Sequence, residues 1–296
     1  MNWTAERIGD QKGRTFVVTG ATSGLGLVTA RELAARGGRV LLAVRDAARG
    51  EDVAALLRRA HPGADVAVRR VDLLDLGSIR RAAAEIGSEP VDVLVNNAGI
   101  SMVGHSVTAL GTERHFAANH LGHFALTALL APALRRSPAP RVVTVTSYLH
   151  EKGELDLDDV AWTRKYTPLA AYSASKLANA VFAVELARRE ESSPTPITSV
   201  LAHPGYSNTP MQSKGSGLTG ILMRVAGRLF AQSPEMGALP QLFAATEPGL
   251  AAGSYVGPDG RGGRSGHPTL VPLSAAARDP ELGRRLWERS EQLVGG

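Results

Sequence analysis

Short apolar runs alternate with longer runs of helical spacing along the first 205 residues of the chain. The short runs are rich in Val and Leu, as buried strands are, and the longer ones repeat Ala, Leu and Arg three and four residues apart, as helices do. Alternation of this kind winds into an open parallel sheet with helices on both faces. The pattern predicts strands over residues 14–19, 39–44, 65–73, 91–97, 141–147 and 197–205, and helices over 26–37, 47–61, 78–86, 109–134 and 167–182. We therefore predict an α/β fold with a doubly wound parallel sheet of six or seven strands.

The pattern changes beyond these elements. Residues 206–246 begin with a Gly-rich stretch and continue as an apolar helix and a second helix, which starts at Ser233, an N-cap residue followed by Pro. Residues 253–268 predict a last short strand followed by irregular chain, and residues 279–293 predict a terminal amphipathic helix. No linker divides the chain, so we expect a single domain.

Composition narrows the classes of protein that fit. The chain has 296 residues and no cysteine, so it has neither a disulfide framework nor a thiolate metal site. Its net charge of +5 comes from arginines spread over many segments, which is unlike the basic block of a nucleic-acid-binding protein. The amino terminus is polar, and no run of about 18 apolar residues follows it. We expect a cytoplasmic protein that neither spans a membrane nor binds nucleic acid.

Three glycines, Gly20, Gly24 and Gly26, lie between the first predicted strand and the first predicted helix. Their spacing is wider than the common G-x-G-x-x-G, but glycines here still allow a tight turn, and a helix N-terminus offers N–H groups and a positive dipole end to a pyrophosphate. Thr22 and Ser23 add hydroxyl donors. Three glycines alone also fit a plain structural turn. Their place after the first strand, where a Rossmann fold has its ligand crevice, favours nucleotide binding.

The end of the second predicted strand distinguishes NAD from NADP. An acidic residue there would bind the ribose 2′-hydroxyl and repel a 2′-phosphate, but the chain has Val44 followed by Arg45. An arginine fork pairs with phosphate. Asp46 is an acidic alternative, although its position before a helix favours an N-cap role. The sequence favours NADP(H).

Tyr172 and Lys176 lie four residues apart, on one face of a predicted helix. Reduction of a carbonyl requires an acid that protonates the developing alkoxide, and a tyrosine can serve when a nearby cation favours its phenolate. Ser147, at the end of the fifth predicted strand, has a hydroxyl that can orient the carbonyl. The Tyr and Lys spacing alone is common in ordinary helices.

Together these segments resemble the short-chain dehydrogenase/reductase family, in the branch that includes retinol dehydrogenases and protochlorophyllide reductases. The resemblance covers about residues 14–260. The segments that carry it are TGATSGLG (19–26), VDLLDL (71–76), NNAG (96–99), Asn119 in AANHLGHF, Ser147 in VTVTS, YSASK (172–176) and HPG (203–205).

The resemblance implies roles for further residues. Asn119 would hold a water in a proton relay that runs through Lys176, and Lys176 would bind the nicotinamide ribose. The cofactor would also be bound by Leu25 in the glycine turn, by Asp72 and Leu73 at the adenine, by Asn97, Ala98 and Gly99, by Pro204 and Gly205, and by Thr209 at the carboxamide. Two alternatives remain, because Asp72 also fits a helix cap and Asn97 also fits a turn.

The domain would then consist of a cofactor-binding core at about 14–205, a substrate lid at about 206–246 and a C-terminal tail at about 258–296, within a single unit of residues 1–296. Its expected activity is NADP(H)-dependent reduction of a ketone or aldehyde to an alcohol, or the reverse, with a rather apolar substrate and Tyr172 as general acid and base. The alternative is a non-catalytic NADP-binding regulator or scaffold, which normally lacks the Tyr or the Lys. The family favours a homodimer or homotetramer.

Two other chemistries fit poorly. His115, His120 and His123 share a predicted helix without an acidic or cysteine partner at ligand spacing, so we expect no metal site. A serine hydrolase would carry its nucleophile on a strained elbow such as G-x-S-x-G, and Ser147 is not in one.

Overall fold

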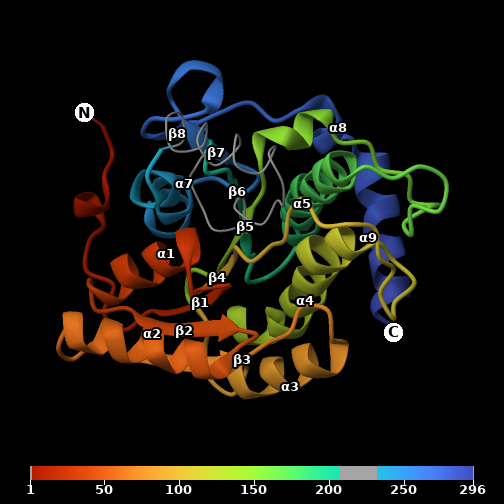
Figure 1. Ribbon diagram of the computed structural model, residues 1–296. Coiled ribbons are helices and arrows are strands. Elements are labelled where there is room, and N and C mark those ends of the chain that lie inside the picture. The colour runs from red at the N-terminus through yellow and green to blue at the C-terminus, as the bar shows by residue number, and fades with distance from the viewer. Residues whose placement is uncertain (1, 207–231, 296) are drawn as a thin grey trace, which may run out of the picture.

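A computed structural model describes residues 2–206 and 232–295 of the chain. Its centre is an eight-stranded sheet in the order β3-β2-β1-β4-β5-β6-β7-β8 (Figure 1). Seven strands are parallel, and β8 runs antiparallel to β7. The strands are β1 (Thr15–Thr19), β2 (Arg39–Val44), β3 (Val66–Arg70), β4 (Val93–Asn96), β5 (Arg141–Val145), β6 (Thr198–Ala202), β7 (Tyr255–Pro258) and β8 (Pro268–Leu270). The predicted doubly wound α/β fold is confirmed.

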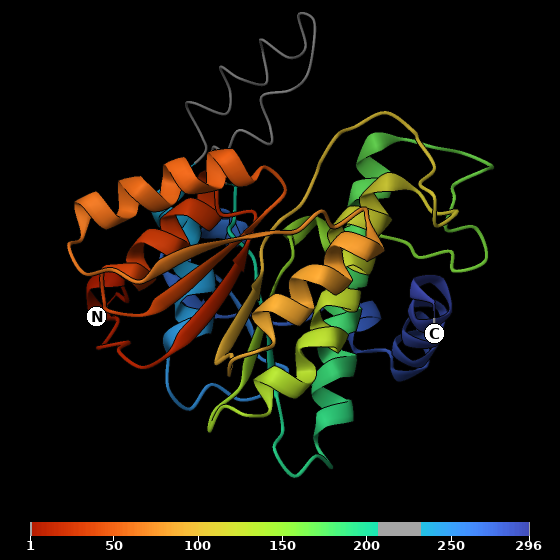
Figure 2. The same cartoon turned by 90° about the horizontal axis from the view of Figure 1, so that it is seen from below.

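Helices cover both faces of the sheet (Figure 2). One face carries α1 (Gly24–Ala34), α2 (Ala47–Ala60) and α7 (Pro234–Thr246), and the other carries α3 (Leu76–Ile86), α4 (Gly122–Leu134) and α5 (Pro168–Glu190). Shorter elements are η1 (Ala5–Arg7), the π-helical turn η2 (Phe116–Leu121), η3 (Tyr148–Lys152) and η5 (Arg261–Gly263). The chain ends with α8 (Ala275–Arg278) and α9 (Pro280–Val294).

Successive side chains along each strand point to opposite faces of the sheet, so the protein has one apolar core on each face. In β1, Phe16 and Val18 pack into the core under α1, α2 and α7, whereas Val17 packs into the core under α3 and α4. After β3 the chain crosses to β4, which lies on the other side of β1. This reversal between β1 and β4 is the point at which a doubly wound sheet opens a ligand crevice along its carboxyl edge.

The helix predicted over residues 109–134 begins later than expected. Residues 109–113 are not helical, and Val107 pairs with Glu113 in an isolated β-bridge. The Glu113 carboxylate accepts hydrogen bonds from the backbone N–H groups of His115 and Phe116, so it caps the helix at that point. Likewise, the third predicted strand ends at Arg70 instead of residue 73, and β8 forms where we expected irregular chain.

The terminal helix α9 forms as predicted and packs along α5, on the outer side of α4 (Figure 1). Its Trp287 ring stacks on Phe182 of α5, with ring centroids 5.9 Å apart, and meets Phe124 of α4 edge to face at 5.0 Å. The Arg189 guanidinium lies 4.4 Å from the centroid of the same ring. The last helix of the chain therefore covers the helix that carries Tyr172.

We expect the folded state to lose stability steeply between pH 6.5 and about 4. Burial lowers the pKa of His120 to about 3 and the pKa values of His123 and His203 to about 4. As the pH falls below 6.5, the unfolded chain binds protons that the folded chain excludes, so the free energy of unfolding drops by up to about 4 kcal/mol per pH unit for three such groups. Urea unfolding from pH 7.5 to 4.5 measures this slope. The His120→Leu variant should show a shallower one, and a flat wild-type profile would contradict the assignment.

Candidate active site

The glycine turn after β1 is shaped by close backbone contacts. Gly20 and Gly24 have φ angles of +68° and +55°, which other residues rarely adopt. A Cβ atom on Gly26 would lie 2.5 Å from Nδ2 of Asn97 and 2.6 Å from the carbonyl oxygen of Gly20. Any side chain at position 26 would therefore displace the turn.

The N-terminus of α1 is open to a ligand. Ser23 occupies the N-cap position in an extended conformation, yet its side chain makes no capping hydrogen bond. By contrast, side chains cap α2, α3, α5, α7, α8 and α9 among the helices that the structure describes. The uncapped N–H groups, with the half-buried Thr22 and Ser23 beside them, fit a pyrophosphate.

Three polar side chains hold the turn in place, and two of them, Thr19 and Gln241, were not predicted for this role from the sequence. The Thr19 hydroxyl accepts hydrogen bonds from the backbone N–H groups of Asn97 and Ala98, both at 2.9 Å. The Asn97 amide donates to the Thr19 carbonyl at 2.7 Å, so this side chain does satisfy the turn. From α7, Gln241 donates to the Thr29 hydroxyl and to Oδ1 of Asn97. The sequence signal for this role of Gln241 was a single polar residue in the middle of an otherwise apolar helical segment.

Two arginines lie near the carboxyl ends of β2 and β3. Strand register pairs Val44, which precedes Arg45, with Arg70, the last residue of β3, so the backbones of both arginines are close at the carboxyl edge of the sheet. Both side chains are exposed, and neither has a polar or ionic partner within the described part of the chain. Asp46 accepts a hydrogen bond from the Arg49 backbone and caps α2, as predicted. Arg70 was missed because register between strands is not visible in the sequence.

The predicted adenine-binding residues lie in the loop after β3. Oδ1 of Asp72 accepts a hydrogen bond from the Leu74 backbone, and Asp75, not Asp72, caps α3. The helix-cap alternative for Asp72 is therefore wrong. Leu73 lies against α4, where a Cβ atom on Gly122 would be 2.4 Å from the Leu73 carbonyl oxygen.

Helix α5 brings Tyr172 and Lys176 to the carboxyl edge of the sheet. It begins after Thr167, whose hydroxyl accepts a hydrogen bond from the Ala170 backbone. Nζ of Lys176 lies 5.9 Å from the centroid of the Tyr172 ring and donates to the Val145 carbonyl at 3.1 Å. Burial lowers the pKa of Lys176 to about 8.

Burial also raises the pKa of Tyr172 to about 12, although a hydrogen bond with the Ser147 side chain acts in the opposite direction. Ser147 follows β5 and is 8% exposed, and its hydroxyl oxygen also accepts a hydrogen bond from the Leu149 backbone. The phenol is therefore neutral at physiological pH, and it interacts with the Ser147 side chain.

Asn119 is completely buried in the π-helical turn η2. Oδ1 accepts a hydrogen bond from the backbone N–H of Ile100, and Nδ2 donates to the Ile100 carbonyl and to the Ser175 hydroxyl. A Cβ atom on Gly99 would lie 3.1 Å from Oδ1 of Asn119 and 3.6 Å from Nζ of Lys176. Gly99 thus lies between these two polar groups.

The structure brings the predicted catalytic residues together around the end of β4 and β5. The family model described as short chain dehydrogenase matches residues 14–216. The chain belongs to the short-chain dehydrogenase/reductase family.

Relatives of this short-chain dehydrogenase/reductase match it over nearly its whole length. Human retinol dehydrogenase 13 is 39% identical over 96% of the chain and 85% of its own length. Mouse polyprenol dehydrogenase is 41% identical over 96% of the chain and 85% of its own length. Among solved structures, an uncharacterised protein from Mycobacterium paratuberculosis is 42% identical, with a TM-score of 0.82 over 99% of this chain and 98% of that one. The chain is thus an oxidoreductase of a family that uses a nicotinamide dinucleotide.

Part of the short-chain dehydrogenase/reductase site lies outside the described residues. Thr209 and most of the predicted substrate lid fall there. At the near end, Gly205 has a φ angle of +65°, and the Gln232 amide donates to the Pro204 carbonyl at 2.6 Å. Residues 234–246 form α7, which packs in the core of the sheet.

One expectation about the histidines is wrong. His115 has an acidic partner, because its Nδ1 lies 2.7 Å from Oε1 of the fully buried Glu113. Its ring meets the Tyr172 ring edge to face, with centroids 6.1 Å apart. Within the described ranges, no group of three or more His, Cys, Asp or Glu side chains is arranged to hold a metal ion.

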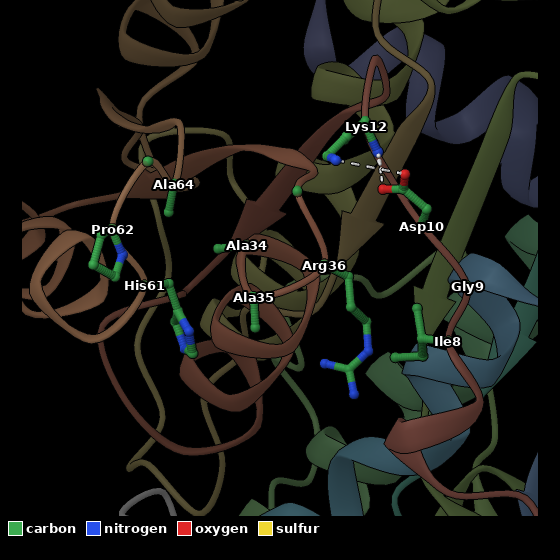
Figure 3. Close-up of a pocket in the computed structure, with 12 residues that line it drawn as sticks. Ile8, Gly9, Asp10, Lys12, Ala34, Ala35, Arg36, His61, Pro62 and Ala64 are labelled. Carbon is green, nitrogen blue, oxygen red and sulfur yellow. Dashed lines mark hydrogen bonds and ion pairs between the residues drawn. The ribbon is translucent and has the colours of Figure 1, made fainter.

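A surface hollow lies at the other edge of the sheet (Figure 3). Its lining comes from residues 8–10, 12, 34–37 and 61–64, at the amino ends of β1, β2 and β3, and includes the exposed pair of Asp10 and Lys12. The active-site residues are at the carboxyl ends of the strands, so this hollow is not part of their site.

No helix in the described segments has the length and hydropathy to cross a bilayer.

Proposed function

We propose that this short-chain dehydrogenase/reductase is an NADP(H)-dependent oxidoreductase that interconverts a rather apolar alcohol and its ketone or aldehyde. The convergence of Tyr172, Lys176 and Ser147 beside Asn119 carries the proposal. A regulator or scaffold on this fold has no use for a phenol hydrogen-bonded to a serine beside a buried lysine.

In the reducing direction, Ser147 donates a hydrogen bond to the substrate carbonyl and polarises it. With its pyrophosphate held at the glycine turn, the reduced dinucleotide would supply the hydride that the carbonyl carbon receives. Tyr172 donates its phenolic proton to the developing alkoxide. The ammonium of Lys176 stabilises the phenolate that remains, because an opposite charge within about 6 Å favours the charged form of a tyrosine.

Preference for the phosphorylated cofactor rests on Arg45 and Arg70. Both guanidinium groups extend from the carboxyl ends of β2 and β3, without acidic partners in the described part of the chain. Unpaired arginines at the position of the ribose 2′ group fit a phosphate through paired, charge-assisted hydrogen bonds.

An apolar substrate is supported by the surroundings of the site and by the relatives. Met102, in the loop after β4, is 45% exposed, and Leu169, in the first turn of α5, is 51% exposed. The names of the relatives specify retinol and polyprenol, which are both apolar alcohols. Cytoplasmic location and assembly as a homodimer or homotetramer stay predictions.

A panel of long-chain apolar and short polar aldehydes, ketones and alcohols tests the function. We expect turnover with NADPH, and with NADP⁺ for the alcohols, and higher kcat/KM for the apolar members. Binding of NADPH to the chain without turnover of any member would favour the non-catalytic alternative. Faster turnover of polar substrates would contradict the proposed substrate class.

A further inference from the structure

His123 is a buried titratable residue that the proposed chemistry does not use. It lies on α4, one helical turn after Asn119, and is 1% exposed. Nδ1 of its ring lies 2.8 Å from the backbone carbonyl oxygen of Asn119, and Nε2 lies 2.9 Å from the hydroxyl of Thr19. One imidazole therefore contacts both the glycine-turn strand β1 and the helix that carries Asn119.

The protons in these contacts can be assigned from the chemistry of the partners. A carbonyl oxygen only accepts, so Nδ1 of His123 carries a proton and donates it to Asn119. Burial and the nearby charge of Lys176 lower the pKa of His123 to about 4, so the ring is neutral and Nε2 is an acceptor. The Thr19 hydroxyl consequently donates to Nε2, which is closer than its other acceptor, the Val95 carbonyl at 3.3 Å.

These bonds form two runs that meet at Asn119. In the first, Thr19 receives the N–H groups of the segment after β4 and donates to His123, which donates to the backbone carbonyl of Asn119. In the second, the Asn119 side-chain amide donates to the Ser175 hydroxyl, which donates to the backbone carbonyl of Tyr172 at 2.7 Å. The donors within each run point the same way, so the bonds within a run strengthen one another.

We propose that His123 is a positioning residue, which fixes Asn119 and the catalytic helix α5 relative to the cofactor turn. The inference rests on the proposed function. Catalysis of hydride and proton transfer depends on sub-ångström placement, and a misplacement of about 1 Å can lower the rate about 100-fold. The hydrogen bond between His123 and Thr19 joins the end of β1, where the cofactor turn begins, to the helix that holds Asn119. It therefore helps to set the distance between the cofactor and the catalytic residues.

The same helix offers a matched control. His120 is also buried and neutral, and its Nε2 donates to the Ser290 hydroxyl of α9, which in turn donates to the Leu286 carbonyl. His120 has no hydrogen bond to Thr19, Asn119 or any residue of the proposed chemistry. Replacing either histidine removes a buried imidazole from the continuous helix of η2 and α4, but only the replacement of His123 removes the link to Thr19.

The test compares three variants with NADPH and the best substrate of the panel. We expect His123→Leu to lower kcat about 30-fold and to change the Kd for NADPH less than about threefold, because Thr19 keeps its two N–H donors and can turn to Val95. His123→Gln should recover kcat to within about threefold of wild type, because its side-chain amide oxygen can accept a hydrogen bond from the Thr19 hydroxyl as Nε2 does. His120→Leu should lose unfolding free energy but keep kcat.

Provided that the wild-type chain is active, three outcomes would overturn this inference and leave the proposed function standing. These are wild-type kcat in His123→Leu, an equal loss of kcat in His120→Leu, and no recovery in His123→Gln. If His123→Leu does not fold, kcat of the Gln variant and long-range proton–nitrogen NMR of the wild-type ring test the inference instead. A ring protonated at Nε2 instead of Nδ1 then overturns the inference. Lack of any wild-type turnover overturns the proposed function first.

Discussion

Replacing Tyr172 with Phe should lower kcat about 1,000-fold and leave the Kd for NADPH within about threefold. The substitution removes one oxygen atom, and with it the phenolic proton donor that interacts with Ser147 and lies close to Lys176. The ring keeps its edge-to-face contact with His115. Because a well-placed general acid contributes about 100-fold to 10,000-fold, the loss should appear in kcat and not in binding.

Tyr166→Phe is the matched control for this substitution. The Tyr166 hydroxyl donates to the Val103 carbonyl at 2.6 Å and joins two surface loops. Its loss should change kcat less than about fivefold, as expected of a hydrogen bond worth about 1 kcal/mol. Stopped-flow measurement of a single turnover separates proton and hydride transfer from product release. A Tyr172→Phe enzyme that retains a tenth of the wild-type single-turnover rate would exclude this tyrosine as the acid.

Arg45→Ala should weaken NADPH binding about 50-fold and NADH binding less than threefold. Arg70→Ala should have the same sign and a smaller effect, about tenfold, and the double variant should bind the two cofactors about equally. A charge-assisted hydrogen bond contributes about 1.5–3 kcal/mol, and only the 2′-phosphate of NADPH receives it. Both arginines are exposed and lack acidic partners in the described part of the chain, so their removal should not affect folding.

Arg59→Ala tests whether net charge alone produces this result. Arg59 is exposed in the last turn of α2, at the opposite end of the helix from Arg45, and its replacement removes the same charge away from the carboxyl edge of the sheet. Isothermal titration with each cofactor, repeated at high salt, measures the difference. Equal losses for NADH and NADPH in Arg45→Ala, or an equal loss in Arg59→Ala, would contradict phosphate pairing.

Local features of the site could be predicted from the sequence. The glycine turn, the Asp46 and Ser233 caps and the alternation of strands and helices all depend on residues a few positions apart. The family resemblance then indicated which polar residues to place together. The structure describes most of them at one edge of the sheet, and Thr209 lies outside the described residues.

Contacts between distant segments could not be predicted. Arg70 joins Arg45 through strand register, and Gln241 reaches Asn97 across 144 positions of the chain. His123 looked like one of three unremarked histidines on a helix, because its partner Thr19 lies 104 positions away. The start of the long helix was predicted too early for a different reason. Residues 109–113 have a composition typical of a helix, but the Glu113 side chain caps the helix after them.

The position of α9 has a consequence for synthesis of the protein. The outer side of α5 is covered by Trp287 of α9, a helix that follows α5 in the chain. The helix that carries Tyr172 and Lys176 is therefore synthesised before its cover. Until α9 has been made, Phe124 and Phe182 lack their aromatic partner, and a stop codon before Trp287 would leave this apolar surface exposed to aggregation.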